Sequence, residues 1–418
     1  MSALWRAASL AARRPNVAAA IAVALFTLAV ASATGFWLLF RFSYLIAVAI
    51  PLLYFWNRSM IRGIEVEVRR RDQRVSRGRA LQGRVTVRSR SWLPKVWLEV
   101  HDHSTLPGHV TNRVLTLGRN GYDIWRYETP ALRRGLYELG PVTVTATDPF
   151  GFFRMSRTFG ERSEVLVYPN APELPRLHVP PANLPGDGRF RRRTHNVTPN
   201  VSGLRAYEPG DSLSRVHWPA TARTGNLMVK LFELDPASDI WVILDLEQQV
   251  HVGEGDDGTE EAAVMVAASI ARYFITQNRS VGMIAYDNDL RVNEPSRGGN
   301  HYTRLLELLA LARAVGDVPL SQLLLEESRK FGRHTTVVAV TPSPRDDWAL
   351  ALMSLSARGV KVAAVLLEGE TFGASTSSLD VYGTLASGGV YTYTVKRQDD
   401  LVQVLSSVGV GDRGGVYA

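Results

Sequence analysis

The hydrophobic pattern divides the chain into an apolar N-terminal stretch and a longer part in which apolar and polar residues alternate. Residues 17–40 carry no charged side chain, Arg41 interrupts the run, and residues 42–56 resume it. A helix of the first length crosses a hydrocarbon core of about 30 Å, since each residue adds about 1.5 Å. The pattern predicts two transmembrane helices within residues 1–60, and a turn moved back to residues 33–35 would lengthen the second.

The two-helix prediction has two alternatives, and the flanking basic residues predict the orientation of the helices. A signal peptide is one alternative to two transmembrane helices, but about forty apolar residues exceed a single signal-peptide core. One spanning helix with a re-entrant segment is another. Basic flanks stay on the cytoplasmic side, so we expect a multi-pass cell-membrane protein with a cytoplasmic N-terminus and a large cytoplasmic C-terminal region. The flanking arginines are Arg6, Arg13, Arg14, Arg58, Arg62, Arg69, Arg70 and Arg71.

A period of two residues dominates the next segment, residues 61–170. Apolar and polar side chains alternate over residues 96–101 and 142–147, and turn signals such as Asp148-Pro149-Phe150-Gly151 separate such runs. This alternation is typical of strands with one buried face. Short strands without intervening helices predict an antiparallel β-sandwich. A linker rich in proline and arginine follows at residues 171–202, and we expect it to remain outside both neighbouring cores.

The C-terminal part, residues 237–418, alternates apolar strands with amphipathic helices. This order predicts a parallel, doubly wound α/β sheet, so the fold class of the whole chain is α+β multidomain. Strands are expected at residues 240–246, 281–286, 335–340, 361–367 and 390–393, and helices at residues 260–277, 302–314, 320–331, 347–358 and 398–407.

Composition narrows the possible partners. The formal net charge is +8. The sequence contains no cysteine, and this absence fits a reducing compartment. In a membrane-tethered protein, an excess of basic over acidic residues favours contact with anionic lipid headgroups, so the lipid bilayer is the first expected partner. No nucleic-acid-binding module is recognisable, and we expect no nucleic-acid partner.

Residues 203–236 carry a dense motif. The segment reads Gly-Leu-Arg-Ala-Tyr-Glu-Pro-Gly-Asp from residue 203 and Val-His-Trp-Pro-Ala-Thr-Ala-Arg from residue 216. It resembles the signature of the DUF58 family, from which Ser214, Val216 and His217 depart. The candidate binding or structural residues of this signature are Arg205, Tyr207, Gly210, Asp211, Arg215, His217, Trp218, Arg223, Lys230 and Glu233.

The signature has a structural and a functional interpretation. Ion pairs between its arginines and carboxylates, with Trp218 as a packing anchor, would lock an extended loop onto a domain face. Alternatively, its arginine, tyrosine and tryptophan side chains would form a docking surface. Asp211 and His217 are the candidates for a hydrolase, but no activated serine or cysteine accompanies them. No catalytic residue is therefore predicted.

The resemblance also implies a von Willebrand factor A-like (vWA-like) fold for the C-terminal domain. In that fold a divalent cation binds at the carboxyl ends of the strands through a D-x-S-x-S loop. This chain has Asp245-Leu246-Glu247-Gln248-Gln249 there, so the aspartate is present and both serines are missing. We expect a degenerate site at Asp245 with no bound metal and no cofactor. An unusual metal-dependent enzyme site near Asp245 is the alternative.

The resemblance implies that this protein works together with a MoxR-type AAA+ ATPase. Such an ATPase is therefore the implied protein partner. The sequence and the resemblance together predict a membrane-anchored cytoplasmic scaffold for protein–protein interaction rather than an enzyme.

Overall fold

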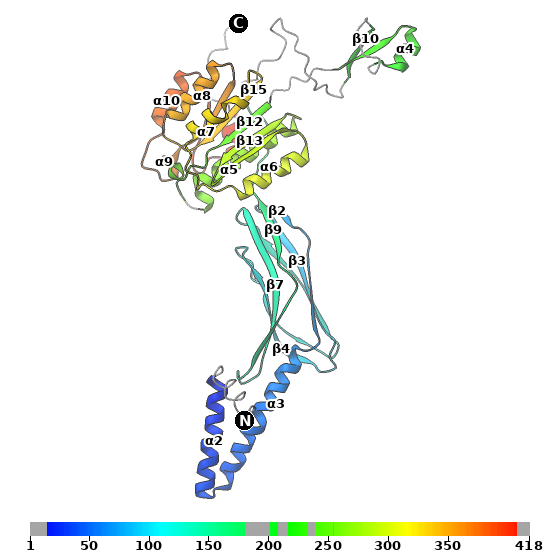
Figure 1. Cartoon of the computed structure of the whole chain (residues 1–418), viewed down its shortest axis with the longest axis vertical. Coiled ribbons are helices and arrows are strands. Elements are labelled where there is room, and N and C mark those ends of the chain that lie inside the picture. The colour runs from blue at the N-terminus through cyan, green and yellow to red at the C-terminus, as the bar shows by residue number, and fades with distance from the viewer. Residues whose placement is uncertain (1–14, 180–200, 208–215, 233–238, 254, 408–418) are drawn as a thin grey trace. The chain divides into compact units, whose positions relative to one another are not determined.

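The computed structural model describes residues 15–179, 201–207, 216–232, 239–253 and 255–407. It divides into two compact units, Met1–Pro169 and Asn170–Ala418. The first unit contains two long helices and a β-domain, and the second contains a signature hairpin and an α/β domain (Figure 1).

Two apolar helices open the first unit, α2 (Pro15–Thr34) and α3 (Trp37–Ile61). Both are long and apolar enough to cross a membrane, with mean hydropathies of 2.2 and 1.9. The turn between them contains Gly35 at φ +67°, a left-handed conformation that favours glycine at the end of a helix. The expected continuation of the first helix to Phe40 is therefore wrong, and the alternative turn is confirmed. Arg41 lies inside α3, with its guanidinium 4.3 Å from the centroid of the Trp37 ring.

The two helices contact each other through small side chains. Ala31 is fully buried, and the hydroxyls of Thr27 and Ser43 are 2.7 Å apart across the helix pair. Small residues and interhelical hydrogen bonds are what hold helices together where no hydrophobic effect operates between them.

The β-domain consists of two sheets that share one core. Apolar residues of both sheets, including Val85, Val87, Val100 and Val144, form a single buried cluster, as the period-two alternation predicts. One sheet has the strand order β1-β3-β6, and the other β2-β9-β7-β4-β5 with β8 also paired to β7. The pairing of β2 with β9 is parallel, so the sandwich is not wholly antiparallel. The strands are β1 (Ile64–Arg70), β2 (Arg74–Ser76), β3 (Ala80–Ser89), β4 (Lys95–Ser104), β5 (Asn112–Leu117), β6 (Tyr122–Pro130), β7 (Gly135–Thr147), β8 (Arg154–Phe159) and β9 (Ser163–Tyr168).

The C-terminal end of α3 enters the β-domain core. Met60 is 2% exposed and belongs to the core cluster of the two sheets. Lys95, fully buried at the start of β4, donates a hydrogen bond from Nζ to the carbonyl of Ser59. A cation bound to the last carbonyls of a helix complements the negative end of its dipole. Burial lowers the pKa of Lys95. Helix and β-domain are thus joined by packing and hydrogen bonds as well as by the chain.

The α/β domain contains a six-stranded sheet of order β14-β13-β12-β15-β16-β17. All pairings are parallel except that of β14, which runs antiparallel to β13. The predicted doubly wound sheet is therefore present, with one antiparallel edge strand that the sequence did not indicate. The strands are β12 (Asp239–Leu244), β13 (Val281–Tyr286), β14 (Leu290–Ser296), β15 (Thr335–Thr341), β16 (Lys361–Leu367) and β17 (Tyr391–Val395).

Helices cover both faces of this sheet (Figure 1). Residues of α5, α6 and α11 pack on the face that carries Val242 and Leu244, and residues of α7, α8 and α10 pack on the face that carries Trp241 and Ile243. Because successive residues of a strand point to opposite faces, strands covered on both sides are continuously apolar. The helices are α5 (Thr259–Thr276), α6 (Gly299–Leu311), α7 (Leu320–Glu326), α8 (Asp347–Ala357), α9 (Gly369–Phe372), α10 (Leu379–Ser387) and α11 (Leu401–Ser406).

The described part of the linker packs on the α/β domain, which differs from the expectation that it stays outside both cores. Leu174 and Leu177 are 5% and 8% exposed and belong to the core cluster that contains α5. Arg272 donates to the carbonyl of Ala171 at 2.8 Å, and the Tyr393 hydroxyl bonds to the backbone of His178. The apolar side chains between the prolines account for this packing.

Candidate functional site

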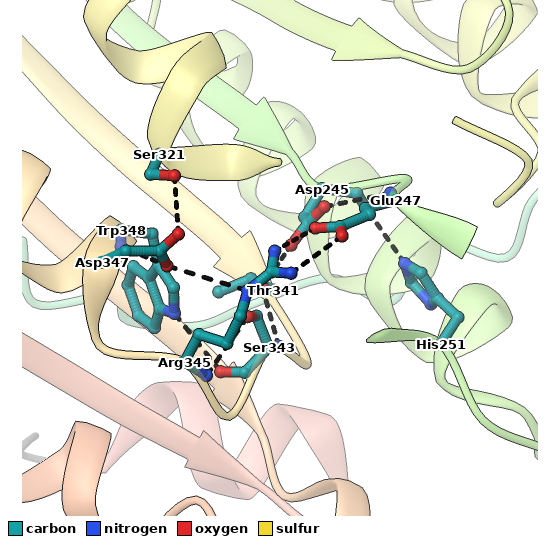
Figure 2. Close-up of polar contacts among 9 residues, drawn as sticks. All are labelled: Asp245, Glu247, His251, Ser321, Thr341, Ser343, Arg345, Asp347 and Trp348. Atoms are coloured by element: carbon teal, nitrogen blue, oxygen red, sulfur yellow. Dashed lines mark hydrogen bonds and ion pairs between the residues drawn. The ribbon is translucent and has the colours of Figure 1, made fainter. Parts of the chain in front are cut away.

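The candidate site lies at the carboxyl ends of β12 and β15, the two central strands of the α/β sheet (Figure 2). The chain leaves β12 toward β13 on one side and returns to β15 on the other, so strand order reverses at this point. In open α/β sheets, the crevice at such a reversal is where ligands bind. Asp245 follows β12 directly, and Thr341 is the last residue of β15.

Asp245 is held by three groups in the protein interior. It is 2% exposed, its Oδ2 accepts a hydrogen bond from the Thr341 hydroxyl at 2.5 Å, and its Oδ1 accepts one from the Glu247 amide at 3.1 Å. His251 bonds through Nε2 to the Asp245 carbonyl at 3.0 Å. Burial raises the pKa of Asp245 to about 6, and the bonds from Thr341 and Glu247 partly offset that rise. Both carboxylate oxygens are therefore already engaged.

The raised pKa of Asp245 predicts a pH-dependent contribution to stability. The folded protein binds this proton more tightly than the unfolded chain, whose aspartate pKa is about 4, so stability falls as pH rises from about 4 to about 6. Asp245→Asn removes the ionisable group, so the free energy of unfolding no longer falls over this pH range. The substitution is expected to raise the free energy of unfolding by about 1–3 kcal/mol at pH 7 and to leave it unchanged below pH 4. Urea unfolding of both proteins between pH 4 and pH 8 measures the difference. A difference that does not change with pH would contradict this origin.

Glu247 forms an ion pair with Arg345, which follows β15 in the chain (Figure 2). Arg345 Nη1 donates to Glu247 Oε1 at 3.0 Å, and Nη2 donates to Oε2, so the contact is bidentate. The Glu247 side chain is 3% exposed and that of Arg345 is 39% exposed. These hydrogen bonds raise the pKa of Arg345. A planar guanidinium with two parallel bonds is the strongest ion-pair geometry that proteins use.

The loop that carries Arg345 is fixed by its own hydrogen bonds. The Ser343 amide donates to the Thr341 hydroxyl at 2.9 Å, and Trp348 Nε1 donates to the Ser343 carbonyl at 3.3 Å. Ser343 and Trp348 are both fully buried. Asp347 accepts a bond from the Ser321 hydroxyl of α7 at 2.8 Å. The position of Arg345 is thus set by the core, and its guanidinium is preorganised against Glu247.

The donor set at this edge does not fit a divalent cation. The Glu247 carboxylate is neutralised by Arg345, and Asp245 is bound by Thr341 and a backbone amide. Magnesium needs several oxygen ligands arranged around one point. Within the described residues, no group of three or more histidine, aspartate or glutamate side chains is placed to hold a metal ion. The arrangement is a fixed network in which Arg345 and Glu247 compensate each other's charge.

The DUF58-like signature forms a small hairpin with a short helix. β10 (Val201–Ala206) pairs with β11 (Met228–Phe232), and α4 (Trp218–Thr224) lies between them in sequence. His217 is the N-cap of α4, and its Nδ1 accepts the Ala220 amide at 3.1 Å. This ring nitrogen therefore satisfies a helix end that a carboxylate commonly caps. An engaged ring nitrogen gives no support to a hydrolytic role for His217.

Within the hairpin, the buried anchors are Val216 and Val229, which are 4% and 3% exposed. Trp218, predicted as a packing anchor, is the first residue of α4 and is 64% exposed. Arg223 is exposed, and Arg205 donates to the Ala206 carbonyl at 3.0 Å. Tyr207 and Lys230 are half-buried. The remaining signature residues, Gly210, Asp211, Arg215 and Glu233, lie outside the described residues, as do the ion pairs predicted for their charges.

From the sequence we predicted that Asp245 lies at the sheet edge, but we did not predict the ion pair of Glu247 with Arg345. The two are 98 residues apart, and no spacing rule links them. A signal was nevertheless present, since Glu247 and Arg345 lie three and four residues after the ends of two buried parallel strands, and such strands end at one edge of a sheet.

Fold and site together define a protein with two apolar helices, a β-domain and an α/β domain whose central edge is closed by an internal ion pair. Residues 203–371 match the family model described as "Protein of unknown function DUF58", which confirms the resemblance over this segment. Uncharacterized protein YeaD of Bacillus subtilis is 24% identical over 226 residues, 53% of this chain and 54% of YeaD. Uncharacterized protein Rv1480 of Mycobacterium tuberculosis is 22% identical over 170 residues, 39% of this chain and 53% of Rv1480. The chain thus spans about half the length of these curated relatives.

Among solved structures, BatB from Bacteroides thetaiotaomicron is similar with a TM-score of 0.32 and 13% identity, covering 40% of this chain and 95% of BatB. The CARDB domain of PF1109 from Pyrococcus furiosus has a TM-score of 0.20 and 17% identity, covering 25% of this chain and 94% of that domain. Scores this low carry no functional argument.

Proposed function

We propose that this protein is a membrane-anchored cytoplasmic scaffold that binds another protein through its α/β domain and signature hairpin. The observation that carries the proposal is the ion pair of Glu247 and Arg345, which occupies the usual ligand-binding edge of the sheet with a rigid, charge-compensated pair. An enzyme needs a free nucleophile or acid–base pair at such an edge. Here the carboxylates are bound within the protein, and this favours recognition over turnover.

Two helices of membrane-spanning length support the anchor. Their mean hydropathies are 2.2 and 1.9, and most of their surface is exposed in the protein itself, as expected of helices surrounded by lipid. Arginines flank both ends of the pair, which favours a multi-pass topology with the β-domain and α/β domain in the cytoplasm.

The proposed vWA-like character of the α/β domain rests on its sheet. Its doubly wound sheet of mostly parallel strands and its aspartate directly after β12 are the features that the resemblance implies. In this interpretation, the Arg345 guanidinium compensates the Glu247 carboxylate at the edge where a vWA domain would hold a cation.

The signature hairpin is the second proposed contact. Trp218, Leu204 and Leu227 are exposed at 64%, 40% and 41%, a density of large apolar side chains that a two-stranded hairpin cannot bury alone. Exposed tryptophan and arginine side chains dominate the binding energy of many protein interfaces. The family resemblance implies a MoxR-type AAA+ ATPase as the partner.

Co-purification tests this proposal. The full-length protein, solubilised in detergent, is used to capture the MoxR-type ATPase encoded in the same genome. Trp218→Ala is expected to reduce the amount captured at least about tenfold, the loss of one interface hot spot. Leu379→Ala, which alters a 73% exposed side chain on α10, is the matched control and should leave capture unchanged. Equal capture by all three proteins would contradict a contact through Trp218, and no capture by the unmodified protein would contradict the proposed partner.

A further inference from the structure

We propose that the loop Asp148–Phe153, between β7 and β8, is a wedge that inserts the Phe150 and Phe152 side chains into the lipid bilayer beside α2 and α3. The inference rests on the proposed membrane anchor and gives a role to the Asp148-Pro149-Phe150-Gly151 turn. The loop belongs to the β-domain, yet three independent sets of contacts place it against the apolar helices.

The loop is preorganised by Asp148, which is 3% exposed. Its Oδ2 accepts the Phe150 amide at 3.0 Å, and its Oδ1 accepts the Phe153 amide. Its carbonyl accepts the Gly151 amide at 3.0 Å, and Gly151 has φ +72°, which favours glycine. One side chain thus fixes a tight turn whose tip is Phe150. A turn held this firmly presents its tip without further ordering on binding.

The loop is attached to α3 at its far end. Asn57 is fully buried in the last turns of α3, and its Nδ2 donates to the Phe153 carbonyl at 2.7 Å. The ring of Tyr54, one turn earlier, meets the Phe153 ring edge-on at 5.6 Å between centroids. These contacts hold the loop against the part of α3 that precedes the β-domain. The depth of the loop in a bilayer therefore follows that of α3.

The tip of the loop faces the helices with apolar side chains. Phe150 is 70% exposed and stacks on Phe152 at 6.1 Å between ring centroids. Both rings line a hollow of about 560 Å³ together with side chains of α2 and α3. Among the described residues that line it, Asn16 alone is polar, so the hollow suits acyl chains rather than a charged ligand. Its helical lining residues are Asn16, Ala19, Ala20, Val23, Leu45, Ile46, Ala49, Ile50 and Leu53.

A second hollow continues this apolar surface on the other side of Phe150. It measures about 840 Å³ and is lined by Trp56 of α3 and by Val96 and Trp97 of β4. Trp97 is 63% exposed and has φ +59°, an uncommon backbone conformation for a bulky residue. Backbone strain of this kind persists where surrounding structure and function require it. Exposed tryptophans near the end of a spanning helix are typical of the membrane–water interface.

Lipid is the occupant that these observations favour. The two hollows are continuous with helices that the proposed anchor places in the bilayer, and their linings are largely apolar. The β-domain would then touch the membrane at two places, the end of α3 and the Phe150 loop. Two attachment points restrict rotation of the domain about the helix axis.

The absence of cysteine from the sequence allows a direct test with single labels. Phe150→Cys, Leu45→Cys and Val110→Cys are made in the full-length protein, labelled with a nitroxide and reconstituted in phosphatidylcholine–phosphatidylglycerol vesicles. The three side chains are exposed by 70%, 65% and 81%, so labelling should not disturb the fold. Leu45, within α3, reports the anchor, and Val110, in the β4–β5 connection, reports the aqueous phase. Power-saturation spectroscopy measures collisions with oxygen and with a water-soluble nickel chelate.

The wedge predicts that the label at position 150 behaves like that at position 45, with frequent oxygen collisions and few nickel collisions, while position 110 shows the opposite. A label at position 150 that collides with nickel as often as at position 110, with position 45 still in lipid, would overturn the wedge and leave the anchor standing. Nickel collisions at position 45 would overturn the anchor itself. Protection of position 150 from both reagents would show a protein occupant and overturn the lipid assignment.

Discussion

Replacing Arg345 with alanine is expected to lower the free energy of unfolding of the α/β domain by about 2–4 kcal/mol. The Glu247 side chain is 3% exposed in the intact pair, and the substitution removes its bidentate partner. Removing one member of a buried ion pair is costly because the remaining charge keeps its desolvation penalty. The 39% exposure of Arg345 places the loss below that of a fully buried pair.

Amide hydrogen exchange in the full-length protein measures this effect, through the protection of β12 and β15. Arg397→Ala is the matched control, because Arg397 is 41% exposed and pairs at 2.8 Å with Asp257, which is 72% exposed. An exposed pair contributes at most about 1 kcal/mol, so the control should change protection little. Equal losses in the two variants would show that Glu247 does not depend on Arg345 for compensation.

Replacing Gly316 with alanine is expected to cost about 3 kcal/mol or to prevent folding of the α/β domain. A Cβ at this position would lie 2.6 Å from the Tyr286 carbonyl oxygen, 3.0 Å from that of Asp287 and 3.1 Å from that of Leu246. All three neighbours are backbone atoms, which no rotamer change can move away. Gly316 also exchanges hydrogen bonds with Leu246 and Gln248, so the clash would distort the loop that carries Glu247.

Gly332→Ala is the control for this experiment, since a Cβ there would meet no heavy atom within 4 Å. Gly→Ala at a compatible position is neutral or stabilises by up to about 1 kcal/mol through the unfolded chain. Urea unfolding of the two variants compares them. A Gly316→Ala protein as stable as the Gly332→Ala protein would mean that the loops at this edge can shift freely.

The hydrophobic periodicity of the sequence predicted the strands that are buried on both faces or on one face. The continuously apolar strands β12 and β15 and the alternating strands of the β-domain follow directly from burial on two faces or on one. The edge strand β14, with the sequence Leu-Arg-Val-Asn-Glu-Pro-Ser, was missed, because its half-exposed side chains and its proline give no clear period.

The site was harder to predict because long-range contacts create it. Asp245 follows a predictable strand, but its partner Thr341 lies 96 residues away. The Asn57 amide and the Phe153 carbonyl are likewise 96 residues apart, and neither residue type signals the other. Helix ends also escaped prediction where tertiary packing decides them, as at Ile61, where α3 continues into the β-domain core.

The junction between α3 and the β-domain has a mechanical consequence for the proposed anchor. Met60 in the core, Lys95 on the last helical carbonyls and Asn57 on the Phe153 carbonyl leave no flexible joint at this point. In the proposed anchor, helix and domain are therefore expected to move as one rigid body. Because a helix of fixed length tilts to match bilayer thickness, a thicker or thinner membrane would swing the β-domain with it.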